Sequence, residues 1–236
     1  MSRGEMVSYE LDQSFFQFNN IRVAGTLVPI FSLRTKDSFG VGDFGDLKKM
    51  IDWVAITGQK VLQILPINDS TITHTWTDSY PYSSISIFAL HPQYANLKAL
   101  PQIKDENERK RFAALQAELN ALPQIDYELV NNAKNEYLHI IYNQEGAKLM
   151  KTAKFKQFFE EEKHWLVPYA QYSTLRDKYG TAVYAEWPDH NQWSETDREA
   201  LSNSRSKAYK EVSYYYFLQF VLQEQMMEAH DYARSK

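Results

Sequence analysis

The sequence contains no cysteine among its 236 residues. This absence excludes disulfide bonds, thiolate metal sites, iron–sulfur clusters and a cysteine nucleophile, and it suits a reducing compartment. Glycine and proline are also scarce, with eight of each, and 44% of the residues are hydrophobic, so disordered, collagen-like and low-complexity proteins are excluded. The length fits one large domain or two small ones.

No apolar run approaches the roughly 18 residues needed to cross a bilayer, and the first residues lack the apolar segment and cleavage site of a secretory signal. Neither sign of charge dominates, because 26 Lys and Arg oppose 30 Asp and Glu, a net charge of -4. We therefore expect a soluble, cytoplasmic protein whose main partner is neither a membrane nor a nucleic acid. Aromatic residues are abundant, at 14%, and they pack cores but also face sugars or peptides.

The N-terminal part of the chain predicts a strand, a helix and a second strand. Apolar runs rich in β-branched residues lie at 22–33 and 60–67, and each is typical of a buried strand. Between them, residues 47–55 carry apolar side chains at helical spacing, with Asp43 near the helix start and Gly58 just past its end. Such a unit has parallel strands joined by a right-handed crossover.

Beyond residue 100 the pattern predicts helices only. The candidate helices lie at residues 105–122, 130–142, 152–163, 169–179 and 207–233, with a further helix capped by Ser194 and Asp197. Two parallel strands do not make a stable sheet alone, because each needs neighbours and helices on both faces. Either the helices shield the pair, or strands are missing and the unpaired edge predicts self-association.

Residues 68–84 follow the second strand and show neither a helical nor a strand period. Long ordered loops are usually functional, and this one leaves the C-terminal end of a parallel strand, where α/β proteins place their ligands. It concentrates the rings of Trp76, Tyr80 and Tyr82 with the carboxylate of Asp78. Sugars are bound by this mixture of rings, carboxylates and hydroxyls, although Tyr80 and Tyr82 could equally be core rings with satisfied hydroxyls.

The glycine motif at residues 40–45 fits the dinucleotide pattern G-x-G-x-x-G and is followed by Asp69 at about the ribose-binding distance. However, six residues separate the first strand from Gly40, whereas the dinucleotide turn is tight. Asp43 would also point a carboxylate at the pyrophosphate. We favour a glycine-rich loop that is capped by Asp43 and binds no dinucleotide. A dinucleotide-dependent enzyme is kept as an alternative hypothesis.

Metal and serine-hydrolase sites receive little support. The six histidines are scattered without ligand spacing, so neither a metal site nor a cofactor is expected. A triad could be drawn from His74, Asp78 and a nearby serine, but no G-x-S-x-G motif accompanies it, and polar loops contain such triples by chance.

Five segments occur in an order that resembles the 4-alpha-glucanotransferases of glycoside hydrolase family 77, the amylomaltases and disproportionating enzymes. They are Pro29-Ile-Phe-Ser-Leu-Arg, Phe39-Gly-Val-Gly-Asp-Phe-Gly-Asp-Leu, Gln63-Ile-Leu-Pro-Ile-Asn-Asp, Asp78-Ser-Tyr-Pro-Tyr-Ser-Ser and Phe88-Ala-Leu-His-Pro. Similar segments at residues 172–180, 186–188 and 216–225 extend the resemblance from about residue 22 to the end.

The resemblance implies an α/β fold, a partial (β/α)8 TIM barrel. Its first two strands would lie near residues 26–33 and 61–66. Residues 22–99 would form the first βαβ unit with its aromatic loop, and residues 100–236 a large, mostly helical insertion leading toward the third strand. Residues 1–21 would connect to an upstream module.

The resemblance also implies retaining transfer of alpha-1,4-glucan segments between maltooligosaccharides. The family's catalytic carboxylates belong to motifs that do not occur here, so no residue of this chain is expected to be catalytic. Pro81 and Tyr82 match the family's Ser-Pro-Tyr element, whose tyrosine lies beside the bound glucan. Further substrate-binding candidates at the same barrel edge are Asn68, Asp69, Trp76, Asp78 and Tyr80. Either the chain is a piece of such an enzyme, or it is a free-standing, non-catalytic glucan-binding or interaction domain.

Overall fold

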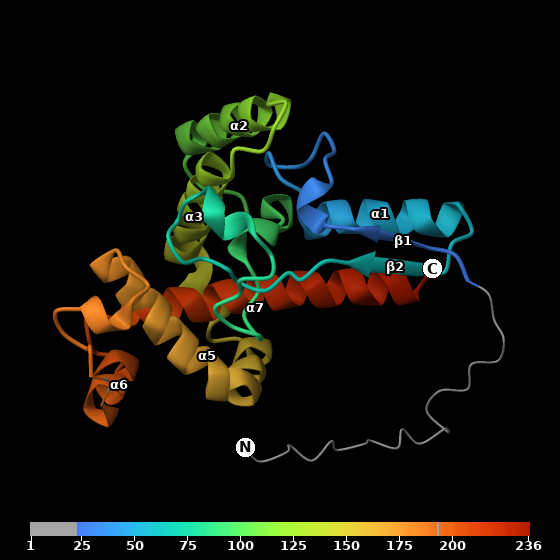
Figure 1. The fold of residues 1–236 in the computed structure, drawn as a ribbon. Coiled ribbons are helices and arrows are strands. Elements are labelled where there is room, and N and C mark those ends of the chain that lie inside the picture. Colours follow the sequence, from blue (N-terminus) through green and yellow to red (C-terminus); the bar gives the residue numbers. More distant parts are fainter. Residues whose placement is uncertain (1–22, 193) are drawn as a thin grey trace, which may run out of the picture.

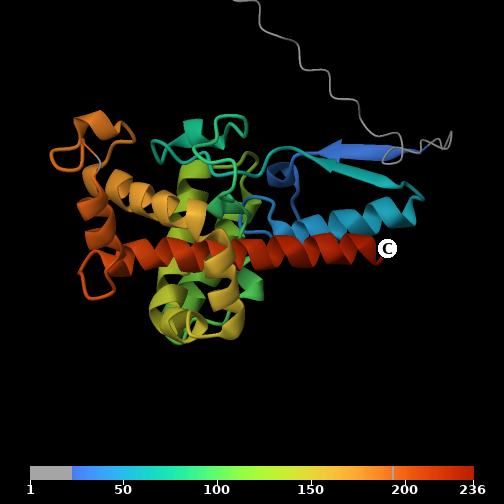
Figure 2. The ribbon, with the colours of Figure 1, turned by 90° about the horizontal axis from the view of Figure 1, so that it is seen from below.

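The computed structural model describes residues 23–192 and 194–236, so the expected connector at residues 1–21 lies outside the described residues. Two strands, β1 (Gly25–Val28) and β2 (Val61–Ile64), form a parallel sheet in which Gly25 pairs with Val61. Helix α1 (Phe44–Ile56) joins them and covers one face of the sheet (Figures 1 and 2). The predicted strand–helix–strand unit is confirmed.

Both strands are shorter and more exposed than the sequence predicts. β1 stops at Val28 because Pro29 cannot donate to a strand ladder, and Ile30–Ser32 forms a 3-10 helix instead. Leu62 pairs within the sheet and packs against the core, whereas Leu27 and Val61 on the other face are 55% and 46% exposed. The prediction of two buried strands is therefore wrong, since no described segment covers that face.

The glycine-rich loop ahead of α1 is shaped by packing. A Cβ atom on Gly42 would lie 1.9 Å from the carbonyl oxygen of Ile30, so only glycine fits there. The Asp43 carboxylate accepts hydrogen bonds from the backbone N–H groups of Gly45 and Asp46, and the Asp46 carboxylate accepts one from the N–H of Asp43. The predicted Asp43 cap is confirmed. Its carboxylate stands where a pyrophosphate would bind, which argues against a dinucleotide site.

Beyond residue 100 the described chain is mostly helical, as the sequence predicts. Its longer helices are α2 (Glu106–Ala121), α3 (Tyr127–Ile141), α5 (Ala153–Tyr179), α6 (Glu195–Ser202) and α7 (Tyr209–Arg234). A π-helical turn (Tyr142–Gly146) and the short α4 (Ala147–Leu149) link α3 to α5. Short 3-10 helices span Trp76–Ser79, Pro92–Tyr94, Leu97–Ala99 and Tyr184–Glu186.

One prediction in this region is wrong. The two helices expected at residues 152–163 and 169–179 are a single helix, α5, with Pro168 inside it. Proline removes one backbone N–H donor and disfavours a helical residue before it. The helix continues because α5 packs along α7 on both sides of Pro168.

Helix α7 forms the centre of the molecule. Every residue from 212 to 222 is buried, because α5, α6 and the π-helical turn pack against α7. Helix α1 packs against α7 as well and contacts it near its C-terminal end. In both ribbon views α7 spans the molecule and lies next to the strand unit at one end and next to the other helices at the other (Figures 1 and 2). A helical segment that is buried on every side requires such surroundings. The βαβ unit and the helices therefore share one hydrophobic core.

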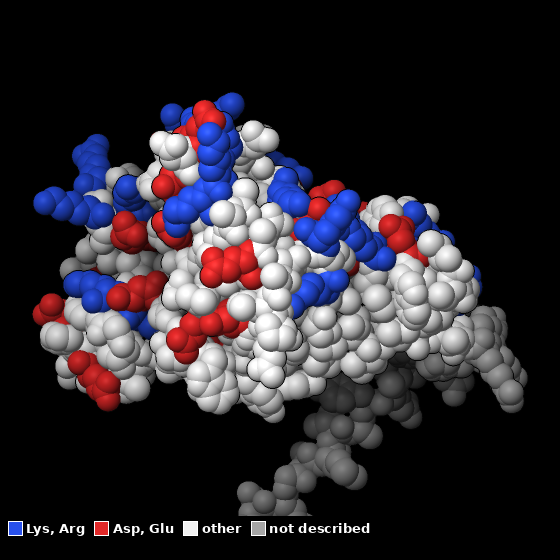
Figure 3. Space-filling model, turned by 90° about the horizontal axis from the view of Figure 1, so that it is seen from above, with Lys and Arg blue, Asp and Glu red and all other residues white. Residues whose placement is uncertain are grey.

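The surface shows no segregation of charge on the face drawn in Figure 3, where basic and acidic side chains are interspersed. Within residues 23–192 and 194–236, no helix combines the length and the apolar character that crossing a membrane requires.

Candidate functional site

The aromatic loop, residues 68–84, leaves the C-terminal end of β2 and carries three exposed rings. Trp76 is 68% exposed, and Tyr80 and Tyr82 are each about three fifths exposed. The Tyr80 and Tyr82 ring centroids lie 5.5 Å apart, with Pro81 between them in sequence. The alternative that these two tyrosines are core rings is therefore wrong. The loop presents flat, amphipathic side chains to solvent, which is the chemistry that stacks on the C–H faces of sugars.

The two candidate carboxylates of the loop, Asp69 and Asp78, are almost wholly buried. Asp78 accepts hydrogen bonds from the backbone N–H groups of Thr73 and His74, the latter at 2.7 Å. Asp69 accepts bonds from the backbone N–H and the hydroxyl of Thr71, and from the hydroxyl of Tyr169 at 2.6 Å. Both carboxylates thus bind the protein's own groups and hold the loop backbone in shape.

Asn68 closes the base of the loop. It forms an antiparallel bridge with Leu90, and its side-chain amide donates to the carbonyl of Ile87 at 2.9 Å. The next residue, Asp69, donates its backbone N–H to Ala89 at 2.8 Å. The start of the loop is therefore tied to residues 87–90, just after its end, which fixes where the loop leaves the protein.

The triad drawn from the sequence does not form. Asp78 binds the backbone of His74 and not its ring, and the hydroxyl of Ser70 donates to the backbone carbonyl of Asp78. The His74 Nε2 atom instead lies 2.9 Å from the carboxylate of Asp177 on α5. In the described part of the chain, no group of three or more His, Asp or Glu side chains is arranged to hold a metal ion.

Side chains of helices α5 and α7 hold the loop through hydrogen bonds. The buried Arg176 donates to the carbonyl of Thr71 at 2.7 Å and to Asp177 at 2.8 Å. Asp177 also accepts a hydrogen bond from the hydroxyl of Tyr215 on α7. Burial opposes ionisation of Asp177, but the His74 and Arg176 contacts outweigh it and lower the pKa of its carboxyl to about 2.

Two further contacts join α5 and α7 to the loop. Burial and the neighbouring Asp69 raise the pKa of Tyr169 well above its usual value, so its hydroxyl keeps the proton that it donates to Asp69. On α7, the Gln219 amide exchanges hydrogen bonds of 2.8 and 2.9 Å with the backbone of Leu90. Contacts between residues 100 and 129 positions apart in sequence thus hold the loop and the segment that follows it.

A wholly buried lysine lies beside the loop. The Lys134 ammonium on α3 donates to the carbonyls of Gln93 at 2.6 Å and Ala95 at 2.9 Å, and lies 3.8 Å from Asp43. Burial lowers the pKa of Lys134 and raises that of Asp43 to about 6. Lys134 therefore joins α3, the start of α1 and the segment after the loop.

A small cavity of about 50 Å³ lies between Lys134 and the underside of the loop. His91 Nδ1 accepts the backbone N–H of Gln93, so the neutral ring carries its proton on Nε2. Among the described residues, His91 Nε2 and Gln93 Oε1 have no hydrogen-bond partner. The cavity thus offers one donor and one acceptor in a space that suits ordered water.

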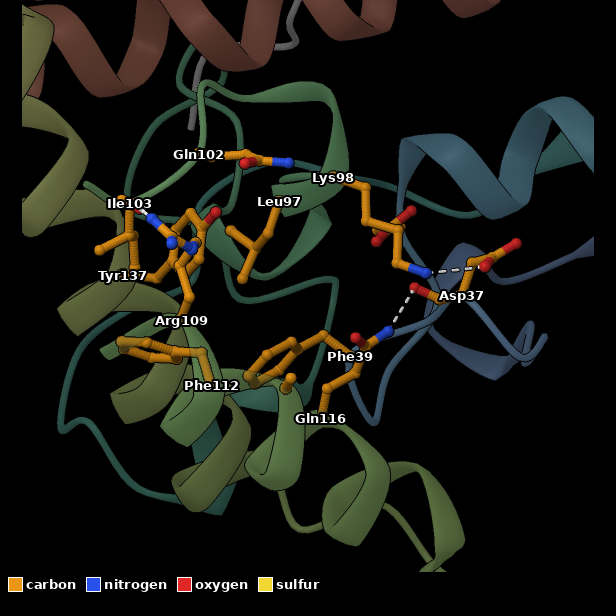
Figure 4. A pocket seen from close by; sticks show the side chains of 12 residues that line it. Asp37, Phe39, Leu97, Lys98, Gln102, Ile103, Arg109, Phe112, Gln116 and Tyr137 are labelled. Carbon is orange, nitrogen blue, oxygen red and sulfur yellow. Dashed lines mark hydrogen bonds and ion pairs between the residues drawn. The ribbon is translucent and has the colours of Figure 1, made fainter. Parts of the chain in front are cut away.

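A second hollow, of about 190 Å³, opens between α2 and the glycine-rich loop (Figure 4). Phe39 and Phe112 line its apolar part, and Asp37 and Lys98 lie at its rim. The Asp37 carboxylate already binds Lys98 at 2.7 Å and Lys49 at 2.6 Å, which hold the pKa of that carboxyl well below its usual range. This hollow contains none of the residues that the sequence predicts for the site.

Comparison with known proteins identifies the family. A family model described as 4-alpha-glucanotransferase, of glycoside hydrolase family 77, matches residues 28–236. The chain belongs to this 4-alpha-glucanotransferase family. It is 36% identical, over 91% of its length, to a 4-alpha-glucanotransferase of Oryza sativa subsp. japonica, and 34% identical over 90% to one of Chlamydia muridarum. The resemblance inferred from the motifs is confirmed.

Solved amylomaltases share the fold of this chain. An amylomaltase from Streptococcus agalactiae in complex with acarbose matches 91% of the chain with a TM-score of 0.74 and 21% identity. An amylomaltase from Corynebacterium glutamicum matches 90% with a TM-score of 0.69 and 22% identity. The chain spans 23% and 39% of the rice and chlamydial relatives, and 41% and 28% of these two structures.

Sequence reasoning missed the supporting residues of the site. Arg176 and Asp177 fall within a segment that resembles the family, but nothing local shows that they reach the aromatic loop. Lys134 could have been noticed, because it lies four residues from Val130 and from Leu138, both of which are buried. A lysine at an apolar position of a helix stripe signals a buried, paired ammonium group.

Proposed function

We propose that the chain is part of a 4-alpha-glucanotransferase that transfers alpha-1,4-glucan segments between maltooligosaccharides, and that it supplies a wall contacting the glucan. One observation carries the proposal: Trp76, Tyr80 and Tyr82 are exposed on a single loop whose two carboxylates, Asp69 and Asp78, are buried and hydrogen-bonded. A rigid loop loses little conformational entropy on binding, so its rings can bind a flexible chain of sugars.

The loop residues have two roles in this proposal. The rings of Trp76, Tyr80 and Tyr82 stack on glucose units, and Pro81 fixes the backbone between the two tyrosines. The base residues, Asn68, Asp69 and Asp78, hold the loop. This role follows from their contacts, because the two carboxylates already accept hydrogen bonds from Thr71, Thr73, His74 and Tyr169.

We further propose that β1 and β2 are the first two strands of a (β/α)8 barrel, with residues 22–99 as its first βαβ unit and residues 100–236 as a helical insertion. Parallel strands followed by helices, and the apolar side chains on the uncovered face of the sheet, support this arrangement. In such a barrel Leu27 and Val61 would face the interior.

We also propose that this chain alone has no transferase activity. The segments that resemble the family include no Arg-x-Asp-His-like stretch and no Glu-Asp-Leu-Gly, and the aspartate and glutamate of the retaining mechanism belong to such motifs. Purified chain incubated with maltotriose should release no glucose. Sustained release, from a preparation free of host amylases, would contradict the proposal.

The glucan-binding part is tested by titrating the chain with maltoheptaose while following tryptophan fluorescence. We expect saturable quenching that Tyr82→Ala weakens roughly tenfold or more, since a ring that stacks on a sugar is removed. Tyr184→Ala is the matched control, because Tyr184 is as exposed as Tyr82 but lies outside the loop. Acarbose, which the Streptococcus agalactiae protein binds, provides a second probe.

The outcome shows whether the aromatic loop binds glucan. Quenching that depends on Tyr82 and not on Tyr184 supports a glucan site on this chain. Folded chain that binds neither maltoheptaose nor acarbose, or that binds them equally well after either substitution, contradicts it.

For partners, we propose that the chain self-associates through its sheet. In the described residues each strand has only one neighbour, and Leu27 and Val61 lie on the uncovered face. An unpaired strand edge beside apolar side chains readily pairs with another copy. Light scattering at increasing protein concentration should show a rising average mass, and a constant monomer mass would contradict this.

A further inference from the structure

His74 has an unusual backbone conformation within the aromatic loop. Its φ angle is +58°, in the left-handed region that few residues other than glycine adopt, although histidine, asparagine and aspartate do so more often than most. Such a conformation costs free energy and persists only where surrounding contacts hold it. Trp76, the most exposed ring of the loop, follows two residues later.

Two carboxylates hold His74, one at its backbone and one at its ring. Asp78, inside the loop, accepts its backbone N–H at 2.7 Å, and Asp177, on α5, lies 2.9 Å from its Nε2 atom. Asp177 is itself fixed by Arg176 and Tyr215. The position of the His74 ring is thus set by a helix that is more than a hundred residues away in sequence.

The backbone of Trp76 is held independently. Its N–H donates to the Glu128 carboxylate on α3 at 3.0 Å, while its ring stays open to solvent. Fixed backbone with a free ring is the arrangement that preorganises an aromatic side chain for stacking. The segment from His74 to Trp76 is therefore held by α5 at one end and by α3 at the other.

We propose that His74 and Asp177 are positioning residues for the glucan-contacting loop: the bond from the His74 ring to Asp177 sets the orientation in which Trp76 meets the glucan. This inference rests on the proposed function. It assigns to α5 a part in ligand binding, although α5 contributes no exposed ring to the loop.

The test compares two amides at position 74. The amide nitrogen of glutamine can replace the Nε2 atom of histidine, so His74→Gln keeps a donor in reach of Asp177. Asparagine is one bond shorter and loses this contact, although it tolerates a positive φ better. Each variant is titrated with maltoheptaose, and its unfolding temperature and the backbone amide hydrogen exchange of residues 73–76 are measured.

We expect His74→Asn to weaken maltoheptaose binding roughly five- to tenfold and to speed exchange at Trp76, while its unfolding temperature stays close to that of His74→Gln. His74→Gln should bind within about twofold of the parent chain, and Asp177→Asn should fall between the two. Tyr232→Phe, which removes a contact between α7 and Asp52 away from the loop, is the control and should change neither readout.

Equal exchange and equal binding in His74→Gln and His74→Asn would overturn the proposal, whether both resemble the parent or both are impaired. If the parent chain binds no glucan, the proposed function fails, and the exchange rates at residues 73–76 still decide whether the Asp177 contact orders the loop. Glucan binding by the parent chain therefore tests the proposed function, and the comparison of the two His74 variants tests the positioning role of His74 and Asp177.

Discussion

The two-stranded sheet and the central part of helix α7 both carry apolar side chains but differ in their surroundings. Residues 212–222 of α7 are all buried, because helices pack around them. In the sheet only one face packs against the protein, so Leu27 and Val61 remain about half exposed. An apolar pattern therefore predicts which element forms, whereas burial depends on how many neighbours the chain provides for that element.

The comparison explains where the candidate site lies. The aromatic loop follows the poorly covered strand, but its base is hydrogen-bonded to α5 and α7, the best-packed part of the molecule. Exposed rings can thus be held rigidly, since the stability comes from the helices and the accessible surface from the strand end. Four predictions test this division of roles.

Lys134→Ala should have the largest effect. It leaves the carbonyls of Gln93 and Ala95 buried without their donor, so the free energy of unfolding should fall by about 3–5 kcal/mol in urea denaturation. Lys110→Ala, which removes an exposed lysine on α2, is the control and should change it by less than about 0.5 kcal/mol. Equal effects would show that the helical region is no more sensitive than the surface.

Asp43→Asn should change how stability depends on pH. The pKa of Asp43 is about 6 in the folded chain and 3.8 is its ordinary value, so between these values the folded state holds a proton that the unfolded state has lost. The stability that this bound proton contributes is complete only below the ordinary pKa of 3.8, and it is lost as the pH rises through 6.

Asparagine also caps helices well, so the variant isolates the charge. Between pH 4 and 7, the stability of the parent chain relative to Asp43→Asn should fall by roughly 2 kcal/mol. Asp105→Asn, at the exposed cap of α2, is the comparison variant. A difference that does not vary with pH would contradict the buried, raised carboxyl.

Tyr169→Phe should have a smaller effect. It removes the hydroxyl that binds the buried Asp69, and we expect a loss of about 1–2 kcal/mol in the free energy of unfolding. Maltoheptaose affinity should fall as well, because the base of the loop loosens. Tyr137→Phe provides the control, because the Tyr137 hydroxyl has no hydrogen-bond partner among the described residues. A similar loss of stability in Tyr137→Phe would contradict a specific contribution from the Tyr169–Asp69 hydrogen bond.

Leu27→Ala should have the smallest effect on stability, within about 0.5 kcal/mol, because the side chain is half exposed. Leu222→Ala, at a fully buried position of α7, should cost about 2–5 kcal/mol. Leu27→Ala should also lower the average mass in light scattering if the sheet mediates self-association. Similar costs at the two leucines would contradict the difference between sheet and helix.

Local signals made most of the elements predictable. The caps at Asp43 and Ser194 and the apolar spacing of the helices depend on residues a few positions apart, and the structure has them where the sequence predicts. The continuous α5 was not predictable, since Pro168 ordinarily ends a helix and only packing against α7 offsets its effect.

The candidate site also has features that the sequence predicts and features that it does not. That residues 68–84 form a loop with exposed rings could be inferred from composition and from the family resemblance. That Asp69 points inward could not, because its partners include Tyr169, one hundred residues away. No local pattern specifies a contact at that separation; it arises only when α5 packs beneath the loop.

The complete burial of Lys134 also provides a reporter of motion. An amine-reactive reagent can acetylate exposed lysines at once, but it reaches Lys134 only when α3 separates from the segment around Gln93 and Ala95. The rate at which mass spectrometry detects modified Lys134 therefore measures how often the protein opens beside the aromatic loop. Slower labelling in the presence of maltoheptaose would reveal that a bound sugar closes this part of the molecule.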